Sequence, residues 1–172
     1  MPIVPDAKDW TWVLGTPCPE CGFQASACSP STAPDQITAM LPRWQAVLRR
    51  PDAAVRPDDD TWSPLEYACH VRDVFALFNQ RLQLMVSQDD ARFEDWDQDR
   101  TAIEMDYAGA DSASVSDELT ARGQEIAASF ARVPESDWGR RGTRSNGSEF
   151  TVLTFSQYFL HDVVHHLHDV AG

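Results

Sequence analysis

The sequence His161-Asp162-Val163-Val164-His165-His166-Leu167-His168-Asp169 holds four of the five histidines in this chain of 172 residues. It belongs to a longer segment, residues 151–170, that contains no Gly or Pro. Thr151 can cap the start of this segment and Gly172 follows its end. We therefore expect one long helix close to the C-terminus.

Within this helix, residues four and seven positions apart share a face. His161, His165 and His168 form one such stripe, whereas His166 points about 100–140° away from it. A His-x3-His pair on one helix is a common way to hold a first-row metal ion. The alternative is that histidines near a helix C-terminus interact favourably with the helix dipole and bind no metal.

A second long helix is expected from Ser63 to about Ser87. Ser63-Pro64-Leu65-Glu66 combines a capping box with Pro at the first helical position. The helix is apolar on more than one side, which indicates a central place in a bundle. His70 lies two turns into it. Histidines on two long helices that face each other would give three protein ligands, the pattern of a catalytic metal site.

Two further helices complete an all-α prediction. One spans residues 35 to about 50, where Pro42 should kink the helix or break its first turns. The other runs from about 114 or 116 to 133. A long acidic connection over 89–111 and a turn-rich loop over 135–150 join the helices. We divide the chain into an N-terminal cysteine-containing arm, residues 1–33, and a four-helix bundle, residues 34–172.

Three of the four cysteines, Cys18, Cys21 and Cys28, lie in this arm, and Cys69 lies in the second helix. Cys18-Pro19-Glu20-Cys21-Gly22 is similar to one knuckle of a zinc ribbon, but a ribbon needs two knuckles. We interpret these cysteines as reduced thiols, or as a bridge formed only on oxidation. A zinc site made of all four cysteines and a redox role are the alternatives.

The formal net charge of −13 argues against nucleic-acid binding through phosphates and against an anionic membrane surface. No apolar run is long enough to span a bilayer, and the N-terminus has no signal-peptide pattern. We therefore expect a cytoplasmic protein that acts on a small molecule. Three cations of the 135–150 loop, Arg140, Arg141 and Arg144, are either solvated or a clamp for an acidic substrate.

Trp62-Ser63-Pro64-Leu65-Glu66 followed by His70, and then His161-Asp162-x2-His165-His166, resembles the DinB/YfiT-like family of metal-dependent proteins over roughly residues 33–170. Segments 96–99 and 147–151 resemble actinobacterial members. The resemblance implies an up-down-down-up four-helix bundle with one long crossover, and a possible homodimer. It also implies three metal ligands, which are His70, His161 and His165.

Relatives in this family include S-transferases that use bacillithiol or mycothiol, and a mycothiol-dependent maleylpyruvate isomerase. The resemblance therefore implies a divalent metal, Zn, Ni or Fe, and a low-molecular-weight thiol cosubstrate. A thiol bound to such a metal loses its proton and becomes a nucleophile. A bound water would instead give a hydrolase. A metal-binding protein without catalysis is the remaining alternative.

Several other residues are candidates either to orient a ligand histidine or to line the pocket beside the metal. Asp162 is about 100° from His161 along the helix, which weakens its case as a partner of that histidine. His168 lies one turn beyond His165 and suits a pocket wall or a proton shuttle. The full set of candidates is His168, Asp73, Asp162, Tyr67, Trp96 and Asp97.

Overall fold

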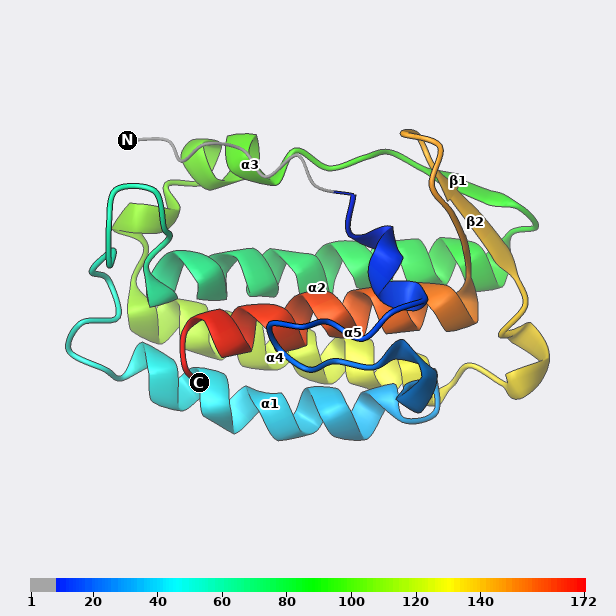
Figure 1. Ribbon diagram of the computed structural model, residues 1–172, viewed down its shortest axis with the longest axis horizontal. Helices are drawn as coiled ribbons and strands as arrows, with labels where there is room; N and C mark the ends of the chain where they lie inside the picture. Colours follow the sequence, from blue (N-terminus) through cyan, green and yellow to red (C-terminus); the bar gives the residue numbers. More distant parts are fainter. Residues whose placement is uncertain (1–8) are drawn as a thin grey trace.

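Four long helices form the body of the computed structural model, which describes residues 9–172 (Figure 1). They are α1 (Ala33–Leu48), α2 (Pro64–Ser87), α4 (Ser112–Ala131) and α5 (Val152–Asp169). All four match helices expected from the sequence, and the mostly helical fold is confirmed. The up-down-down-up order of helix directions stays a prediction.

The expected caps start α2 and α5. At α2 the Ser63 side chain accepts a hydrogen bond from the Glu66 backbone N–H at 3.2 Å, and the Glu66 carboxylate accepts one from the Ser63 N–H at 2.9 Å. At α5 the Thr151 hydroxyl accepts from the Thr154 N–H at 3.2 Å. Each cap satisfies backbone donors that the first helical turn leaves unpaired.

Helix α1 runs through Pro42 without a break, so of the two expected effects, a kink or broken first turns, the second was wrong. Proline removes one backbone donor from the helix interior and crowds the preceding turn. Burial on the other helices offsets that cost, because α1 buries Ile37, Trp44 and Val47 completely. Tertiary packing therefore overrides the local preference here.

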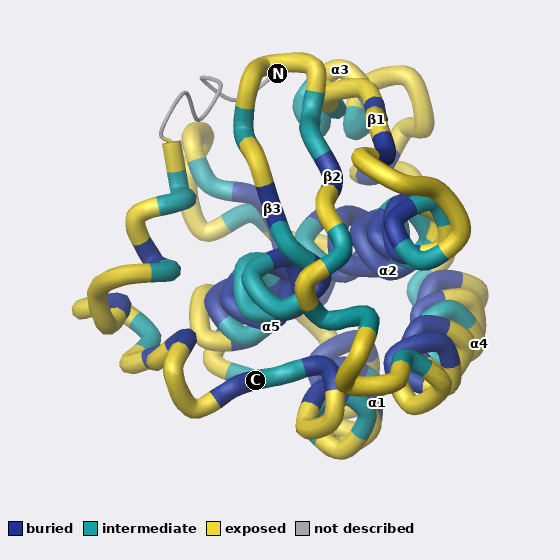
Figure 2. Tube along the Cα trace, turned by 90° about the vertical axis from the view of Figure 1, so that its right-hand side faces the viewer, coloured by how far each residue is buried: buried dark blue, intermediate teal, exposed yellow. Residues whose placement is uncertain are grey.

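The core lies between the four long helices, and the buried segments of α2 and α5 gather in the middle of the molecule (Figure 2). Several aromatic side chains pack against one another in it, and Phe78 stacks on Phe155 with ring centroids 4.9 Å apart. Gly123 on α4 allows a close approach, since a Cβ there would lie 2.5 Å from a Leu41 methyl group. The Phe78–Phe155 contact fixes α5, and with it the histidines, relative to α2.

The two connections between helices contain short regular elements that the sequence did not predict. The first holds strand β1 (Ala91–Phe93), helix α3 (Gln98–Glu104) and a 3₁₀ turn, Tyr107–Gly109. The second holds a 3₁₀ turn, Glu135–Asp137, and strands β2 (Arg141–Arg144) and β3 (Glu149–Thr151). β1 pairs with β2 in parallel, β2 pairs with β3 antiparallel, and the sheet lies beside one end of the bundle (Figure 1).

The N-terminal arm crosses over α5 (Figure 1). It contains two 3₁₀ turns, Trp10–Leu14 and Ala25–Ala27, and both contact α5. The Gln157 side chain on α5 donates a hydrogen bond to the Cys28 carbonyl at 2.9 Å. Residues 1–8 of the predicted arm lie outside the described residues. Among residues 9–172, no helix is both long and apolar enough to cross a membrane.

Candidate metal centres

Helix α5 presents two pairs of possible metal ligands, each spaced four residues apart. One pair is His161 and His165, and the other is Asp162 and His166. Because consecutive helical residues differ by about 100° in direction, the two pairs face different neighbours. The first pair meets the N-terminal arm, and the second meets α2.

The second pair forms a three-residue cluster with His70 of α2. One side-chain donor atom from each of His70, Asp162 and His166 lies within 4.8 Å of the other two. Asp162 Oδ1 is 3.6 Å from His70 Nε2 and 3.7 Å from His166 Nε2. These separations are too long for hydrogen bonds, and they are the spacings of ligands around a shared cation.

The polar atoms of this cluster include several that the protein leaves unpaired. Both ring nitrogens of His70 and Oδ1 of Asp162 are buried without a hydrogen-bond partner among residues 9–172. Buried polar atoms normally have a partner. A divalent cation between them would supply one, so the residues present fit a metal ion.

The charge states of the cluster also suit a cation. Burial lowers the pKa of His70, and the neighbouring His166 lowers it further, which keeps the imidazole neutral and able to coordinate. Burial raises the pKa of Asp162, but His166 and His70 more than offset this, and the net shift is downward. A neutral His70 imidazole and an ionised Asp162 carboxylate result at neutral pH.

Asp169 orients one of these ligands. The ring Nδ1 of His166 lies 3.1 Å from Asp169 Oδ2, so an N–H at this position donates to the carboxylate and leaves Nε2 directed at Asp162. Carboxylates that hold a ligand histidine in this way fix its tautomer and raise its basicity.

The first pair on α5 forms a separate, four-residue cluster with the arm. Donor atoms of Cys18, Cys21, His161 and His165 all lie within 4.8 Å of one another. Cys18 Sγ is 3.7 Å from His165 Nδ1. Burial, followed by the neighbouring His165, lowers the pKa of His161 to about 4, and burial raises the pKa of Cys21 to about 11.

The predicted ligand set of His70, His161 and His165 is therefore divided between two clusters. His70 lies with Asp162 and His166 rather than with the other two. The helix geometry explains the division, because a residue that faces α2 from position 162 excludes position 161 from that face. Cys28 is in neither cluster and hydrogen-bonds to Gln36, while Cys69 lies near the Tyr107 carbonyl.

A cavity of about 970 Å³ opens beside both clusters. Eight of the residues that line it are Asp or Glu, and Arg144 is the only Lys or Arg among the described ones. Its aromatic lining residues are Trp10, Trp62, Tyr67, Trp96 and Tyr158. Asp162 and His166 contribute directly to the wall, so a metal in the three-residue cluster would be reachable from the cavity.

Three of the predicted pocket residues lie around the three-residue cluster. The Trp96 ring stacks on His70 with centroids 5.3 Å apart and an angle of 10°. The Tyr67 ring lies 5.2 Å from the His166 ring. Asp97 lines the cavity and caps α3 by accepting a hydrogen bond from the Arg100 N–H at 2.9 Å.

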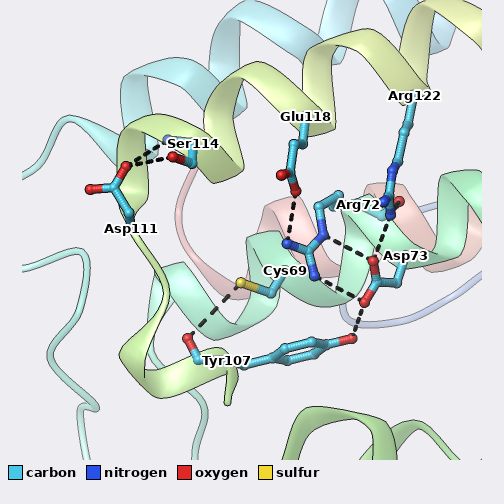
Figure 3. Close-up of polar contacts among 8 residues, drawn as sticks. All are labelled: Cys69, Arg72, Asp73, Tyr107, Asp111, Ser114, Glu118 and Arg122. Carbon is cyan, nitrogen blue, oxygen red and sulfur yellow. Dashed lines mark hydrogen bonds and ion pairs between the residues drawn. The ribbon is translucent and has the colours of Figure 1, made fainter. Parts of the chain in front are cut away.

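Asp73 and His168 lie elsewhere. Asp73 accepts hydrogen bonds from Arg72, Tyr107 and Arg122, in a network that ties α2 to α4 (Figure 3). His168 is exposed, with its ring 6.4 Å from that of His165. Neither residue lines the cavity.

Of the three arginines proposed as a substrate clamp, only Arg144 lines the cavity. Its guanidinium lies 3.5 Å from the Asp95 carboxylate. Arg140 donates to the Met85 carbonyl at 2.8 Å, and Arg141 lies 3.5 Å from Glu149. Each of the three thus already has an acceptor or a carboxylate nearby.

Comparison with known proteins identifies the family to which this chain belongs. The sequence profile of the DinB superfamily matches residues 35–170, which is most of the chain. The chain belongs to the DinB superfamily. A search of curated proteins found no match. The cysteine-containing part of the arm lies before the region that matches the DinB superfamily.

A solved structure supports the same fold. YfiT from Bacillus subtilis, described as a probable metal-dependent hydrolase with an unusual four-helix bundle topology, superimposes with a TM-score of 0.68. The two proteins are 14% identical, and the match covers 86% of each chain. At this identity the likeness to the DinB-like neighbour establishes the fold, namely the four-helix bundle.

Sequence reasoning missed two features of the clusters. The sequence predicts Asp162 only as a residue that orients a ligand histidine and places His166 on another face, although their spacing of four residues is the same as that of His161 and His165. For Cys18 and Cys21, the sequence predicts only other cysteines as partners, in a disulfide or in a zinc site. The C-x2-C and H-x3-H spacings were the available signal, since together they are typical of zinc sites.

Proposed function

We propose that this protein is a metal-dependent enzyme whose divalent metal is held by His70, Asp162 and His166. The observation that carries the proposal is the grouping of three donor atoms, within 4.8 Å, on residues of which two line a large cavity. Three protein ligands leave a coordination position open, which is the arrangement of catalytic sites.

The donor set favours hydrolysis. Two histidines and one carboxylate also make up the zinc site of several peptidases. A metal held by such a set supplies Lewis acidity and a water of lowered pKa. The description of YfiT as a probable metal-dependent hydrolase agrees with this class of reaction.

Two residues of the chain would support the reaction. Burial and the nearby Asp169 raise the pKa of Tyr67 to about 12, so its hydroxyl stays protonated at neutral pH and can donate a hydrogen bond to a substrate oxygen. Asp169 would keep His166 in the tautomer that leaves Nε2 free.

The cavity favours a neutral or positively charged substrate. Its carboxylates outnumber its one arginine, and Arg144 lies near Asp95. The tryptophan and tyrosine rings on its wall add faces that attract organic cations. An anionic substrate would meet repulsion from most directions.

A thiol-dependent transfer, implied by the family resemblance, would use the same site. The carboxylate in the donor set makes the site less positive than three imidazoles would, and the acidic wall opposes a thiolate. Water is therefore the favoured nucleophile. Reaction with a mycothiol-like thiol is tested separately, in parallel with hydrolysis.

The test uses the full chain without an affinity tag, loaded with Zn, Ni or Fe in turn. Hydrolysis is measured with a matched series of chromogenic esters and amides whose acyl groups are neutral, cationic or anionic. In parallel, thiol depletion is followed with a generic electrophile. The variants are His166→Ala and Asp162→Asn, with the exposed His168→Ala as the matched control.

We expect metal-dependent hydrolysis of neutral and cationic compounds, a loss of at least about 100-fold in the two site variants and little change in the control. Thiol depletion that depends on the same residues would show that a thiol, and not water, is the nucleophile at this metal site. Equal metal content and equal activity in wild type and His166→Ala would overturn the proposal.

A further inference from the structure

We propose that Cys18, Cys21, His161 and His165 form a second metal site, a closed structural zinc site that fastens the N-terminal arm to α5. It is separate from the three-residue cluster and does not depend on the proposed function. Its first support is the donor set itself. Two thiols spaced C-x2-C and two imidazoles spaced H-x3-H are the ligand types and spacings of structural Cys2His2 zinc.

The turn in the arm brings the two thiols together. The Gly22 N–H donates to the Cys18 carbonyl at 2.9 Å, and the Cys18 N–H donates to the Phe23 carbonyl at 2.9 Å. Gly22 has a φ of 75°, a left-handed conformation in which glycine is unstrained. Cys21 and Cys18 thus project from one closed turn toward α5, as in a zinc knuckle.

The distances fit a tetrahedral ion. With Zn–S near 2.3 Å and Zn–N near 2.0–2.1 Å, a sulfur and a nitrogen on the same zinc lie about 3.6 Å apart. Cys18 Sγ and His165 Nδ1 are 3.7 Å apart, and all four donors lie within 4.8 Å of one another. A cation placed between them would require only small side-chain movements.

The remaining nitrogen atoms agree with this arrangement. With Nδ1 of His165 directed at the thiol, its Nε2 faces two carboxylates, Glu20 Oε2 at 3.5 Å and Asp169 Oδ1 at 3.6 Å. Zinc-bound histidines commonly present their other ring nitrogen to a carboxylate. His161 is 97% buried, and its Nε2 has no hydrogen-bond partner among residues 9–172.

Aromatic rings cover the cluster. The Trp10 ring lies 5.5 Å from the His161 ring and 5.2 Å from the His165 ring, and Phe23 meets His161 edge-on at 5.5 Å. His161 and His165 also line the cavity, but four protein ligands complete a tetrahedral shell and leave no coordination position for a substrate, so the role is structural. Because Trp10 and Glu20 line the cavity, the zinc would fix one of its walls.

Zinc content of the full chain, purified without a tag and reconstituted with zinc under reducing conditions, tests the site. We expect zinc in the wild type that is lost, by one ion per chain, in Cys18→Ser/Cys21→Ser. The matched control is Cys28→Ser, since Cys28 is in the same arm but outside the cluster. His70→Ala/His166→Ala should keep this ion and lose only the other.

Cobalt substitution separates this site from the three-residue cluster, which contains no sulfur. The wild type and His70→Ala/His166→Ala should show thiolate-to-cobalt charge-transfer absorption, and Cys18→Ser/Cys21→Ser should not. If the enzyme proposal fails but this one holds, the only bound metal will carry the thiolate signature. Equal zinc in the cysteine variant and the wild type would overturn the site.

A measurement on the wild type needs no variant to fold. Alkylation of thiols is followed by peptide mass spectrometry with zinc present and after chelation. Cys18 and Cys21 should be protected by zinc by at least about tenfold in rate, and Cys28 should be unaffected by it. Equal labelling with and without zinc, or a Cys18–Cys21 disulfide that persists under the reducing conditions, would overturn the proposal.

Discussion

Cys18 Sγ lies 3.7 Å from Nδ1 of His165, although 147 positions separate the two residues along the chain. This contact joins the N-terminal arm to the last helix. The neighbouring position on that helix, His166, belongs to the other cluster.

Chelation should release the arm and expose it to proteases. The arm contacts α5 through its two 3₁₀ turns and the Cys18–His165 contact, so loss of the metal removes its strongest attachment. Limited proteolysis within residues 9–28 should accelerate about tenfold after chelation, and His165→Ala should behave like the chelated wild type. His168→Ala is the control. Cleavage at the same rate with and without zinc would contradict the prediction.

Trp96→Ala should weaken metal binding at the three-residue cluster without affecting the other cluster. The Trp96 ring stacks on His70, and its Nε1 donates to Thr101 at 2.8 Å, so the ring holds this imidazole in place. Loss of such a supporting group typically costs about tenfold or more in metal affinity. Competitive titration of metal into the variants Trp96→Ala and Trp96→Phe measures the metal affinity of this cluster. The phenylalanine variant should retain most of the affinity.

Asp73→Asn should lower the free energy of unfolding near neutral pH. It should also reduce the loss of stability that the wild type shows as the pH falls. Burial raises the pKa of Asp73, but hydrogen bonds from Arg72 and Tyr107 outweigh it and the net shift is downward. A carboxyl with a lowered folded pKa stabilises the fold fully above its unfolded pKa, about 3.9, and loses that contribution as the pH falls through the folded value. Below that pH the two proteins should therefore converge.

The expected loss for Asp73→Asn at about pH 7 is about 2 kcal/mol in the free energy of unfolding, because two buried or half-buried arginines lose their charged partner. Urea unfolding at about pH 7 and about pH 3 checks this. Glu118→Gln is a useful comparison, since that more exposed carboxylate contacts only Arg72 in the same network and should cost less. A difference between Asp73→Asn and wild type that stays constant with pH would refute the electrostatic account.

Gly123→Ala should destabilise the packing between α1, α2 and α4. The added Cβ would lie 2.5 Å from Leu41 Cδ2 and 3.0 Å from Phe75 Cε2, both in the core. Overpacking of this kind costs about 1–3 kcal/mol. Gly139→Ala is the matched control, because nothing lies within 4 Å of its added Cβ. Equal urea midpoints for the two variants would show that α4 shifts without cost.

Sequence reasoning recovered the four long helices because their signals are local. Ser63 with Glu66, and Thr151 with an uninterrupted run, mark helix starts through contacts within one turn. The three strands were missed because each has only three or four residues, too few to show alternation. Their pairing depends on Ala91 meeting Gly142, a contact between distant segments.

The clusters were only partly predictable for a related reason. The histidines on α5 were identified, but their division into pairs depends on which neighbour each helix face meets, and a single helix does not specify this. Position 162 faces α2, and position 161 faces the arm. The histidines that face the Cys18 turn lie on the last helix, so no pattern within the arm locates them, and only the C-x2-C and H-x3-H spacings taken together indicate the pairing.

Asp169 approaches a histidine of each cluster, since one of its oxygens lies 3.1 Å from His166 Nδ1 and the other 3.6 Å from His165 Nε2. A metal that draws the Asp169 carboxylate toward one imidazole weakens the interaction of this carboxylate with the other imidazole. The two binding equilibria are then linked, and linkage is reciprocal. Whatever factor the zinc in the arm imposes on the affinity of the cavity metal, the cavity metal imposes on the zinc.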